Sequence, residues 1–163
     1  MIIDLQHLKT YYDLLASLYI VITGLCIGSF INVWIFRGAN AKLNLYPSLP
    51  KDLTTPSTCP NCGVKIPFYL NVPVLGYIAL RGKTACCKQP YSPQYLLLEL
   101  SVGILYYLCY IMSNNFIELI AGFVFIACLV VYVGQKRLGH HSLNLILITA
   151  SSAALFTLVR LYY

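Results

Sequence analysis

Four cysteines lie between two long apolar stretches, as the turn CPNC (Cys59 and Cys62) and the adjacent pair Cys86 and Cys87. A Cys-x-x-Cys turn can present two sulfur atoms to one tetrahedral zinc ion, and a second pair about 20 residues later can complete the shell. Gly63 can take the left-handed conformation that often follows such a turn. The spacing predicts a metal site made of Cys59, Cys62, Cys86 and Cys87.

The second half of this pattern is irregular. A regular knuckle would have a cysteine at position 84, where the chain has Thr84. Adjacent cysteines can both bind one ion only through a strained local turn. Two interpretations stay open: a zinc site, or a loop of free thiols that other contacts hold in shape. A zinc ion would be structural, because four thiolates leave no position for water and the loop contains no histidine.

The composition indicates the kind of chain that carries this loop. Hydrophobic residues make up 59% of the sequence, charged residues 10%, and the mean hydropathy is +0.73. This excludes an ordinary soluble domain. Apolar stretches long enough to cross a bilayer of roughly 30 Å occupy residues 14–36, 96–112, 116–133 and 143–163. We expect an all-α integral membrane protein with about four transmembrane helices.

The positive charges predict the orientation of these helices. Residues 37–95 contain seven Lys or Arg side chains and one acid, Asp52. Such loops stay on the cytoplasmic side. We therefore expect three parts: an N-terminal segment with the first helix (1–36), a cytoplasmic loop with the cysteines (37–95) and three further helices (96–163). The location would be the inner membrane, with lipid as a partner. Nucleic acid is not expected to bind, because the cations are dispersed along the loop.

Small and polar residues mark one face of the first helix. Gly24 and Gly28 have the G-x-x-x-G spacing that lets helices approach closely, and Ser29 and Asn32 add polar atoms beside them. Helix packing is the simpler interpretation of this group, and a substrate groove is the alternative. The remaining cysteines, Cys26, Cys109 and Cys128, fall inside predicted spans, where a thiol behaves as a small apolar residue.

Three ordered motifs resemble those of a known family. They are GSFINVWIFR (residues 28–37), CPNCGVKIPFYLNVPVLGYIALRGK (59–83) and SPQYLLLELSVG (92–103). In order and spacing they are similar to the N-terminal part of the type IV prepilin peptidases, the bifunctional leader peptidase and N-methyltransferase family. The resemblance implies action on type IV prepilins or on the pseudopilins of type II secretion. It also implies S-adenosylmethionine as the methyl donor.

The chain departs from this family at the catalytic residues. The resemblance implies two aspartates after the cysteine loop, because two carboxylates that share a proton can act as base and acid. The only aspartates here, Asp4, Asp13 and Asp52, all precede the second span. The first catalytic aspartate would fall near Gly134. We therefore assign no catalytic residue.

Three functions remain open. The first is a prepilin peptidase-like protein, truncated or degenerate, without aspartic peptidase activity of its own and acting on pilins as an accessory. The second is a retained prepilin N-methyltransferase. The third is one subunit of a split leader peptidase, which would need a partner chain with both aspartates; a homo-oligomer is a further arrangement.

The predicted topology can be tested with reporter fusions. Reporters should locate Lys65 in the cytoplasm and Asn114 outside the cell, because the seven loop cations oppose translocation of the loop. An external signal from Lys65 would contradict the four-span arrangement.

Overall fold

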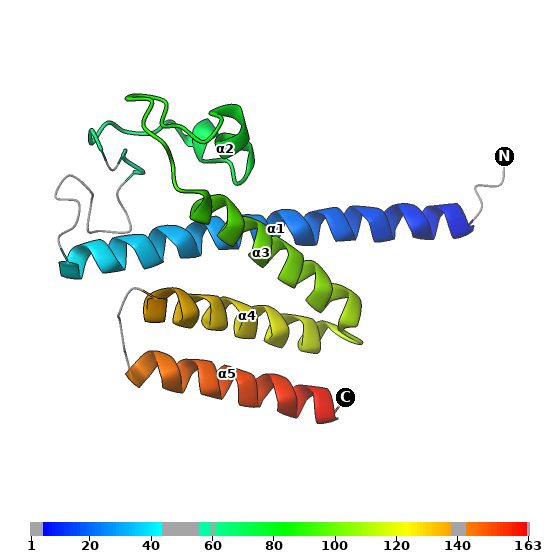
Figure 1. Cartoon of the computed structure of the whole chain (residues 1–163). Coiled ribbons are helices and arrows are strands. Elements are labelled where there is room, and N and C mark those ends of the chain that lie inside the picture. The colour runs from blue at the N-terminus through cyan, green and yellow to red at the C-terminus, as the bar shows by residue number, and fades with distance from the viewer. Residues whose placement is uncertain (1–4, 44–55, 60, 138–142, 163) are drawn as a thin grey trace.

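The structure is a computed structural model that describes residues 5–43, 56–59, 61–137 and 143–162 (Figure 1). The described chain is helical, with a 3-10 turn at Phe68–Asn71 and two isolated β-bridges in the loop. The expected all-α membrane fold is confirmed. The helices are α1 (Leu5–Leu43), α2 (Leu75–Ala79), α3 (Pro93–Met112), α4 (Phe116–Arg137) and α5 (Leu143–Tyr162).

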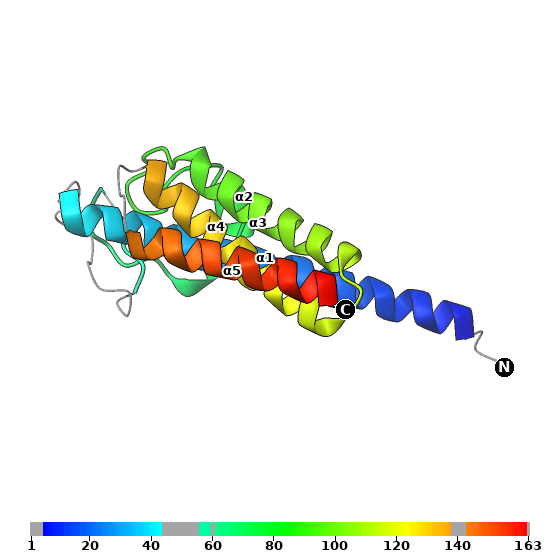
Figure 2. The same ribbon diagram turned by 90° about the horizontal axis from the view of Figure 1, so that it is seen from below.

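Three of these helices are long and apolar enough to cross a membrane. Their apolar stretches are His7–Arg37, Pro93–Met112 and Phe116–Arg137, whereas that of α5, Ile146–Tyr162, is shorter. A fourth span therefore stays a prediction. Helix α1 has 39 residues, about 58 Å at 1.5 Å per residue, so it extends beyond the predicted 14–36 at both ends. Its N-terminal part projects past the other helices in both views (Figures 1 and 2).

Helices α1 and α3 pack at very short range through glycines. A Cβ atom on Gly24 would lie 2.8 Å from Gly103 Cα, and one on Gly28 would lie 3.0 Å from Glu99 Cα. Any larger side chain at these positions would push the helices apart. The packing interpretation of Gly24 and Gly28 is therefore confirmed.

The other end of α1 packs against α4. Ile31 and Ile35 of α1 form a buried cluster with Val131 of α4. Gly134 continues this contact, because a Cβ atom there would collide with Ile35 Cδ1. The contact places the last turn of α4, with Lys136 and Arg137, at the same end of the bundle as the Arg37 end of α1.

Helices α3, α4 and α5 follow one another as antiparallel neighbours (Figure 2). Tyr106 of α3 stacks on Phe123 of α4, with ring centroids 4.1 Å apart, and Phe125 of α4 stacks on Phe156 of α5 at 5.9 Å. Of the three cysteines expected in spans, Cys109 and Cys128 are half-buried, while Cys26 is exposed on the surface of α1.

The start of α3 is fixed by its own sequence. The Ser92 hydroxyl accepts a hydrogen bond from the Gln94 N–H, and Pro93 occupies the first helical position, where its missing N–H is harmless. Helix α3 therefore begins three residues before the predicted 96. Together with the extension of α1 to Leu43, this leaves a shorter loop than residues 37–95.

Candidate functional site

The structure brings the four predicted cysteines together. Their Sγ atoms all lie within 4.8 Å of one another, so the group could hold a metal ion. Cys59 is fully buried and Cys87 half-buried, whereas Cys62 and Cys86 are exposed. The cluster therefore lies at the surface of the loop, with one sulfur atom inside.

The first pair is held by a tight hairpin. Thr58 and Lys65 form an antiparallel bridge, the Cys59 N–H donates to Val64 O at 2.9 Å, and the Gly63 N–H donates to Cys59 O at 2.9 Å. Gly63 has φ of 70°, the left-handed conformation that the sequence indicated. These hydrogen bonds join the two sides of the turn on which Cys59 and Cys62 lie.

The second pair, the adjacent Cys86 and Cys87, lies on a tight turn. The Thr84 N–H donates to Gln89 O at 2.8 Å, and the Lys88 N–H donates to Thr84 O at 3.1 Å. Lys88, which is not a glycine, has φ of 57°. This conformation is uncommon for a residue with a side chain, so the turn that follows the cysteine pair carries local strain. The turn lets both sulfur atoms face the first pair.

The distances between the sulfur atoms are close to those of a tetrahedral site. Metal–sulfur bonds of about 2.3 Å place tetrahedral ligands about 3.8 Å apart. The Cys59–Cys87 distance is 3.7 Å, the Cys86–Cys87 distance 3.9 Å and the Cys62–Cys86 distance 3.0 Å. All exceed the roughly 2.05 Å of a disulfide, and the cysteines are free thiols. The Cys62–Cys86 distance is shorter than the tetrahedral value, so these two sulfur atoms would have to separate to bind one ion.

Thr84 supports the cluster from behind. Its side chain is 5% exposed, its Oγ1 accepts the Gln89 N–H at 3.0 Å, and it lies 3.1 Å from Cys87 Sγ. The Thr84 hydroxyl and the Cys87 thiol share a hydrogen bond in which either group can donate, and to a Cys87 thiolate the hydroxyl is the donor. The residue at the irregular position of the motif is therefore hydrogen-bonded to a neighbouring cysteine.

These hydrogen bonds give the two adjacent thiols, Cys86 and Cys87, different pKa values. Hydrogen bonding to Cys62 is the main cause that raises the pKa of Cys86 to about 12. The Thr84 hydroxyl is the main cause that lowers the pKa of Cys87 to about 6. Of this adjacent pair, Cys87 is therefore the sulfur that carries negative charge at neutral pH.

A cavity of about 180 Å³ adjoins the cluster. Its walls come from the Arg37 end of α1, from the loop with α2 and from the start of α3. Ser29 and Asn32, the polar residues noted on the first helix, both line it. Of the two open interpretations of that face, the glycines serve packing and these two side chains face a cavity.

One wall of the cavity is closed by Glu99. Its Oε2 accepts a hydrogen bond from the Val74 N–H at 2.8 Å, and Val74 has φ of 63° at the start of α2. Tyr91 lies beside it. Burial, followed by the charges of Glu99 and Cys59, raises the pKa of Tyr91 to about 12. The Tyr91 ring is 4.6 Å from that of Tyr95 and 6.5 Å from that of Tyr77, and all three line the cavity.

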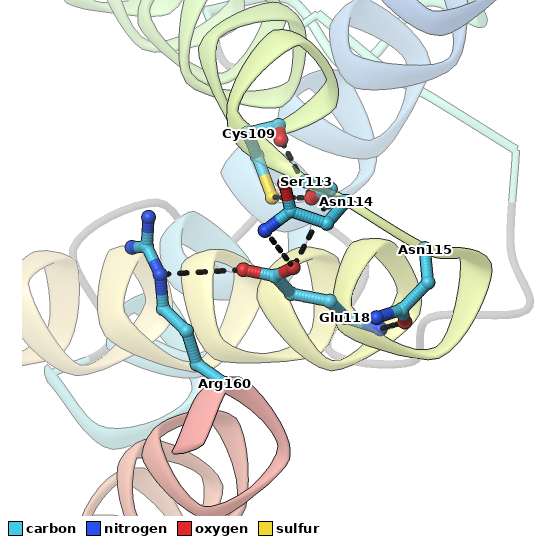
Figure 3. A network of polar contacts seen from close by, with 6 residues as sticks. All are labelled: Cys109, Ser113, Asn114, Asn115, Glu118 and Arg160. Carbon is cyan, nitrogen blue, oxygen red and sulfur yellow. Dashed lines mark hydrogen bonds and ion pairs between the residues drawn. The ribbon is translucent and has the colours of Figure 1, made fainter. Parts of the chain in front are cut away.

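The second glutamate of the helical hairpin is bound in a separate polar network (Figure 3). Glu118 Oε2 accepts the Asn114 N–H at 2.9 Å, and Asn115 Oδ1 accepts the Glu118 N–H at 2.9 Å, which is a cap on α4. Arg160 of α5 forms an ion pair with Glu118 at 3.3 Å. The Glu118 side chain is 3% exposed and that of Arg160 48%.

The described carboxylates are therefore not arranged as an acid–base pair. They are Asp13, Glu99 and Glu118. Thirteen helical steps separate Glu99 from the end of α3, and Glu118 lies just after the turn, so the two are roughly 15 Å or more apart. At Gly134, where the resemblance places an aspartate, Ile35 occupies the space that a side chain would need.

Comparison with known proteins agrees with this architecture. A model of the Bacterial Peptidase A24 N-terminal domain matches residues 22–113. This chain belongs to that family. The prepilin leader peptidase/N-methyltransferase of Myxococcus xanthus is 34% identical over 126 residues, which cover 77% of this chain and 35% of the relative. The protein of the same name from Klebsiella pneumoniae is 33% identical over 129 residues, which cover 78% and 55%.

This chain thus spans about a third to about half of the length of these prepilin peptidase relatives. No solved structure matches it. The family domain covers most of α1, the cysteine loop and α3, so the cluster and the cavity both fall inside it.

Three functional contacts were not predicted from the sequence. The support from Thr84 could have been suspected, because a buried hydroxyl at a ligand position usually binds the neighbouring ligand. The cavity beside Asn32 and the pairing of Arg160 with Glu118 join residues far apart in the chain. No local pattern indicates them.

The charge on Cys87 gives a pH-dependent test. In metal-free protein, iodoacetamide should modify Cys87 with a midpoint near pH 6, because the thiolate is lost as the pH falls below its pKa. Thr84→Val removes the donor and should move that midpoint up, slowing modification at pH 7 roughly tenfold. Mass spectrometry of the modified peptide measures both.

Thr84→Ser keeps the hydroxyl and is the control, with a midpoint close to the original. An unchanged midpoint in Thr84→Val would show that the hydroxyl does not stabilise the thiolate.

Proposed function

We propose that this protein is a prepilin peptidase-like membrane component of type IV pilus or type II secretion biogenesis that binds prepilins or pseudopilins without aspartic peptidase activity of its own. The observation that carries the proposal is the placement of its glutamates. Glu99 supports the loop through Val74, and Glu118 holds α4 and α5 together. Within the part of the chain that the structure describes, neither glutamate lies beside a second carboxylate with which it could share a proton.

The proposed location is the inner membrane, with four spans and the cysteine loop in the cytoplasm. Two contacts support it. Gly134 against Ile35 places Lys136 and Arg137 at the same end as Arg37, where the positive-inside rule would gather them. The Arg160–Glu118 ion pair lies near the far end of both α4 and α5, so α5 runs alongside α4 for its whole length.

The proposed cofactor of the loop is one structural zinc ion held by the four thiolates. Supporting it are the convergence of the sulfur atoms within 4.8 Å and the hydrogen bond to Cys87. Bound zinc would replace a larger apolar core, which this short loop lacks. Its effect would be to hold the hairpin of Cys59 against the turn of Cys87, which together form one wall of the cavity.

A second candidate function is N-methyl transfer, which the curated relatives carry in their names. The cavity favours it. Three tyrosine rings, the carboxylate of Glu99 and the cations Lys65 and Lys83 line the same space. Aromatic faces and mixed charges of this kind suit a methyl donor such as S-adenosylmethionine, which has a base, a sulfonium and an amino acid group.

The zinc proposal predicts metal content. The purified chain should contain about one equivalent of zinc, and Cys59→Ser should release it, because that sulfur is buried at the centre of the cluster. Elemental analysis and the rate of proteolysis within residues 56–92 are the measurements. Cys128→Ser, which removes a thiol from α4, is the matched control and should leave the zinc in place.

A metal-free wild-type chain whose loop resists protease as well as the zinc-loaded chain would show that the thiols hold no structural ion.

The separation of the carboxylates in the described part of the chain predicts no cleavage. The purified chain, incubated with a type IV prepilin and S-adenosylmethionine, should leave the leader attached. Gly134→Asp should not restore cleavage, because a second aspartate would still be missing and the new side chain would collide with Ile35. The Klebsiella pneumoniae relative is the positive control for the assay, and mass spectrometry distinguishes cleavage from methylation.

Methylation without cleavage of a precleaved pilin would support the second candidate. Leader removal by the wild-type chain that is lost in Glu99→Gln would overturn the main proposal.

A further inference from the structure

The loop carries a cluster of exposed apolar side chains. Residues 68–79, the 3-10 turn followed by α2, fold as one apolar unit in which Gly76 packs directly against the Leu70 carbonyl. Its large exposed side chains are Phe68 (85% exposed), Tyr69 (61%), Leu75 (62%) and Ile78 (60%). A contiguous apolar patch is uncommon on a surface that faces only water, so this one indicates an interaction surface.

The apolar unit has two faces with different surroundings. Leu70, Val74 and Tyr77 line the cavity described above. The four exposed side chains lie outside the described lining of that cavity. They form an outer face, which is separate from the candidate site.

The contact with α3 gives the depth of the apolar unit in the membrane. The Val74 N–H donates to Glu99 Oε2 at 2.8 Å, and Glu99 comes six residues after Pro93, about 9 Å along the helix. Helix α3 has 20 residues and is about 30 Å long, so its whole length is needed to cross the hydrocarbon core. The Glu99 side chain is too short to reach back to the start of α3. The first turn of α2 therefore lies inside the membrane boundary.

Helix α1 gives the same level for this contact. A Cβ atom on Gly28 would lie 3.0 Å from Glu99 Cα. Gly28 precedes Arg37, the first cation after the apolar stretch of α1, by nine residues or about 14 Å. Figure 1 shows α2 beside the α1–α3 pair, well within the length of α1. Side chains that point away from the helices at this level meet lipid.

Cations flank the apolar unit on both sides in the chain. Lys65 precedes Phe68 by three residues, Arg81 follows Ile78 by three, and both cations are exposed. The sequence has no Asp or Glu between residues 53 and 98. Clusters of this kind attract anionic lipid headgroups. Exposed apolar side chains with a basic margin are typical of a segment that lies in the membrane interface.

We propose that the outer face of the apolar unit is a lipid-binding surface. Its four exposed side chains insert among the acyl chains of the leaflet on the Arg37 side, and Lys65 and Arg81 bind the phosphates of anionic headgroups. The surface requires only that α1 and α3 cross the membrane, so it does not depend on the proposed function. Because the inner face lines the cavity, the apolar unit separates that cavity from lipid.

The test is the tryptophan fluorescence of the full chain in lipid vesicles. Trp34 is the single tryptophan of the sequence, so in a Trp34→Phe background Phe68→Trp reports on the apolar unit alone. The probe is phosphatidylglycerol with brominated acyl chains, because bromine quenches only a tryptophan that it can contact. Emission from position 68 should fall about twofold relative to unbrominated lipid and should have its maximum at short wavelength.

Two other positions calibrate this signal. Leu97→Trp should be quenched, because Leu97 is 62% exposed on α3 within an apolar stretch long enough to span the membrane. Asn61→Trp should not be quenched, because this exposed polar residue belongs to the cysteine hairpin (residues 58–65). The chain leading into that hairpin is held at the level of Arg37, whose Nη2 donates to Pro56 O at 3.3 Å.

The basic margin is tested with Lys65→Glu in the Phe68→Trp chain. In phosphatidylglycerol this change should roughly halve the quenching, and in neutral phosphatidylcholine it should have little effect. Lys9→Glu makes the same change of charge near the other end of α1 and is the matched control. It should leave the quenching at position 68 unchanged in both lipids.

Unquenched emission at position 68, with Leu97→Trp quenched, would overturn the proposal. Emission at long wavelength would then place the outer face in water, and emission at short wavelength would show that protein, such as a second copy of the chain, covers it. Equal quenching of Asn61→Trp would also overturn it, because the loop would then adhere to lipid as a whole. Unchanged quenching in Lys65→Glu would contradict the headgroup contact.

Discussion

The close approach of α1 and α3 is the contact on which the site depends. Gly24, Gly28 and Gly103 bring the two helices so near that an added Cβ atom would lie 2.8 to 3.0 Å from its neighbours. This approach sets Glu99 against α1, and Glu99 in turn accepts the Val74 N–H at the start of α2. The loop is thereby fastened to the helix pair at one carboxylate. The cavity is the space enclosed between that fastening and the Arg37 end of α1.

The cysteine cluster shows how a backbone can compensate for an irregular motif. Moving one ligand from position 84 to position 86 changes which side of the turn must carry sulfur. Lys88 has a positive φ in this turn, and position 84 still contacts the cluster because the Thr84 hydroxyl is hydrogen-bonded with Cys87. A motif defined by the spacing of cysteines alone would not match the second pair. The four sulfur atoms nevertheless form one continuous cluster. Cys86 contacts Cys62 and Cys87, and Cys87 also contacts Cys59.

The sequence predicts those features that are determined by residues close together in the chain. Apolar length predicted the helices, since it needs only a stretch of one chain, and Ser92 with Pro93 could have located the start of α3. The four cysteines were predicted because metal chemistry restricts their types and spacing. The Arg160–Glu118 pair, by contrast, depends on how α5 packs beside α4, and Arg160 comes 42 positions after Glu118 in the chain. The cavity beside Asn32 depends on the fold of a loop that begins many residues later. Contacts of this kind depend on tertiary packing and leave no local pattern in the sequence.

The two glutamates illustrate why a carboxylate in a membrane helix is not by itself evidence of catalysis. A buried charge there must be satisfied, and at Glu118 the Asn114 and Asn115 turn and Arg160 do so completely enough that the residue acts as a helix cap and an interhelical tie. Glu99 also serves structure, through Val74, but it does so on the wall of a polar cavity. Among the described residues, Glu99 and Glu118 therefore have separate structural roles at the two ends of α3, one on the cavity wall and one in the turn that leads into α4.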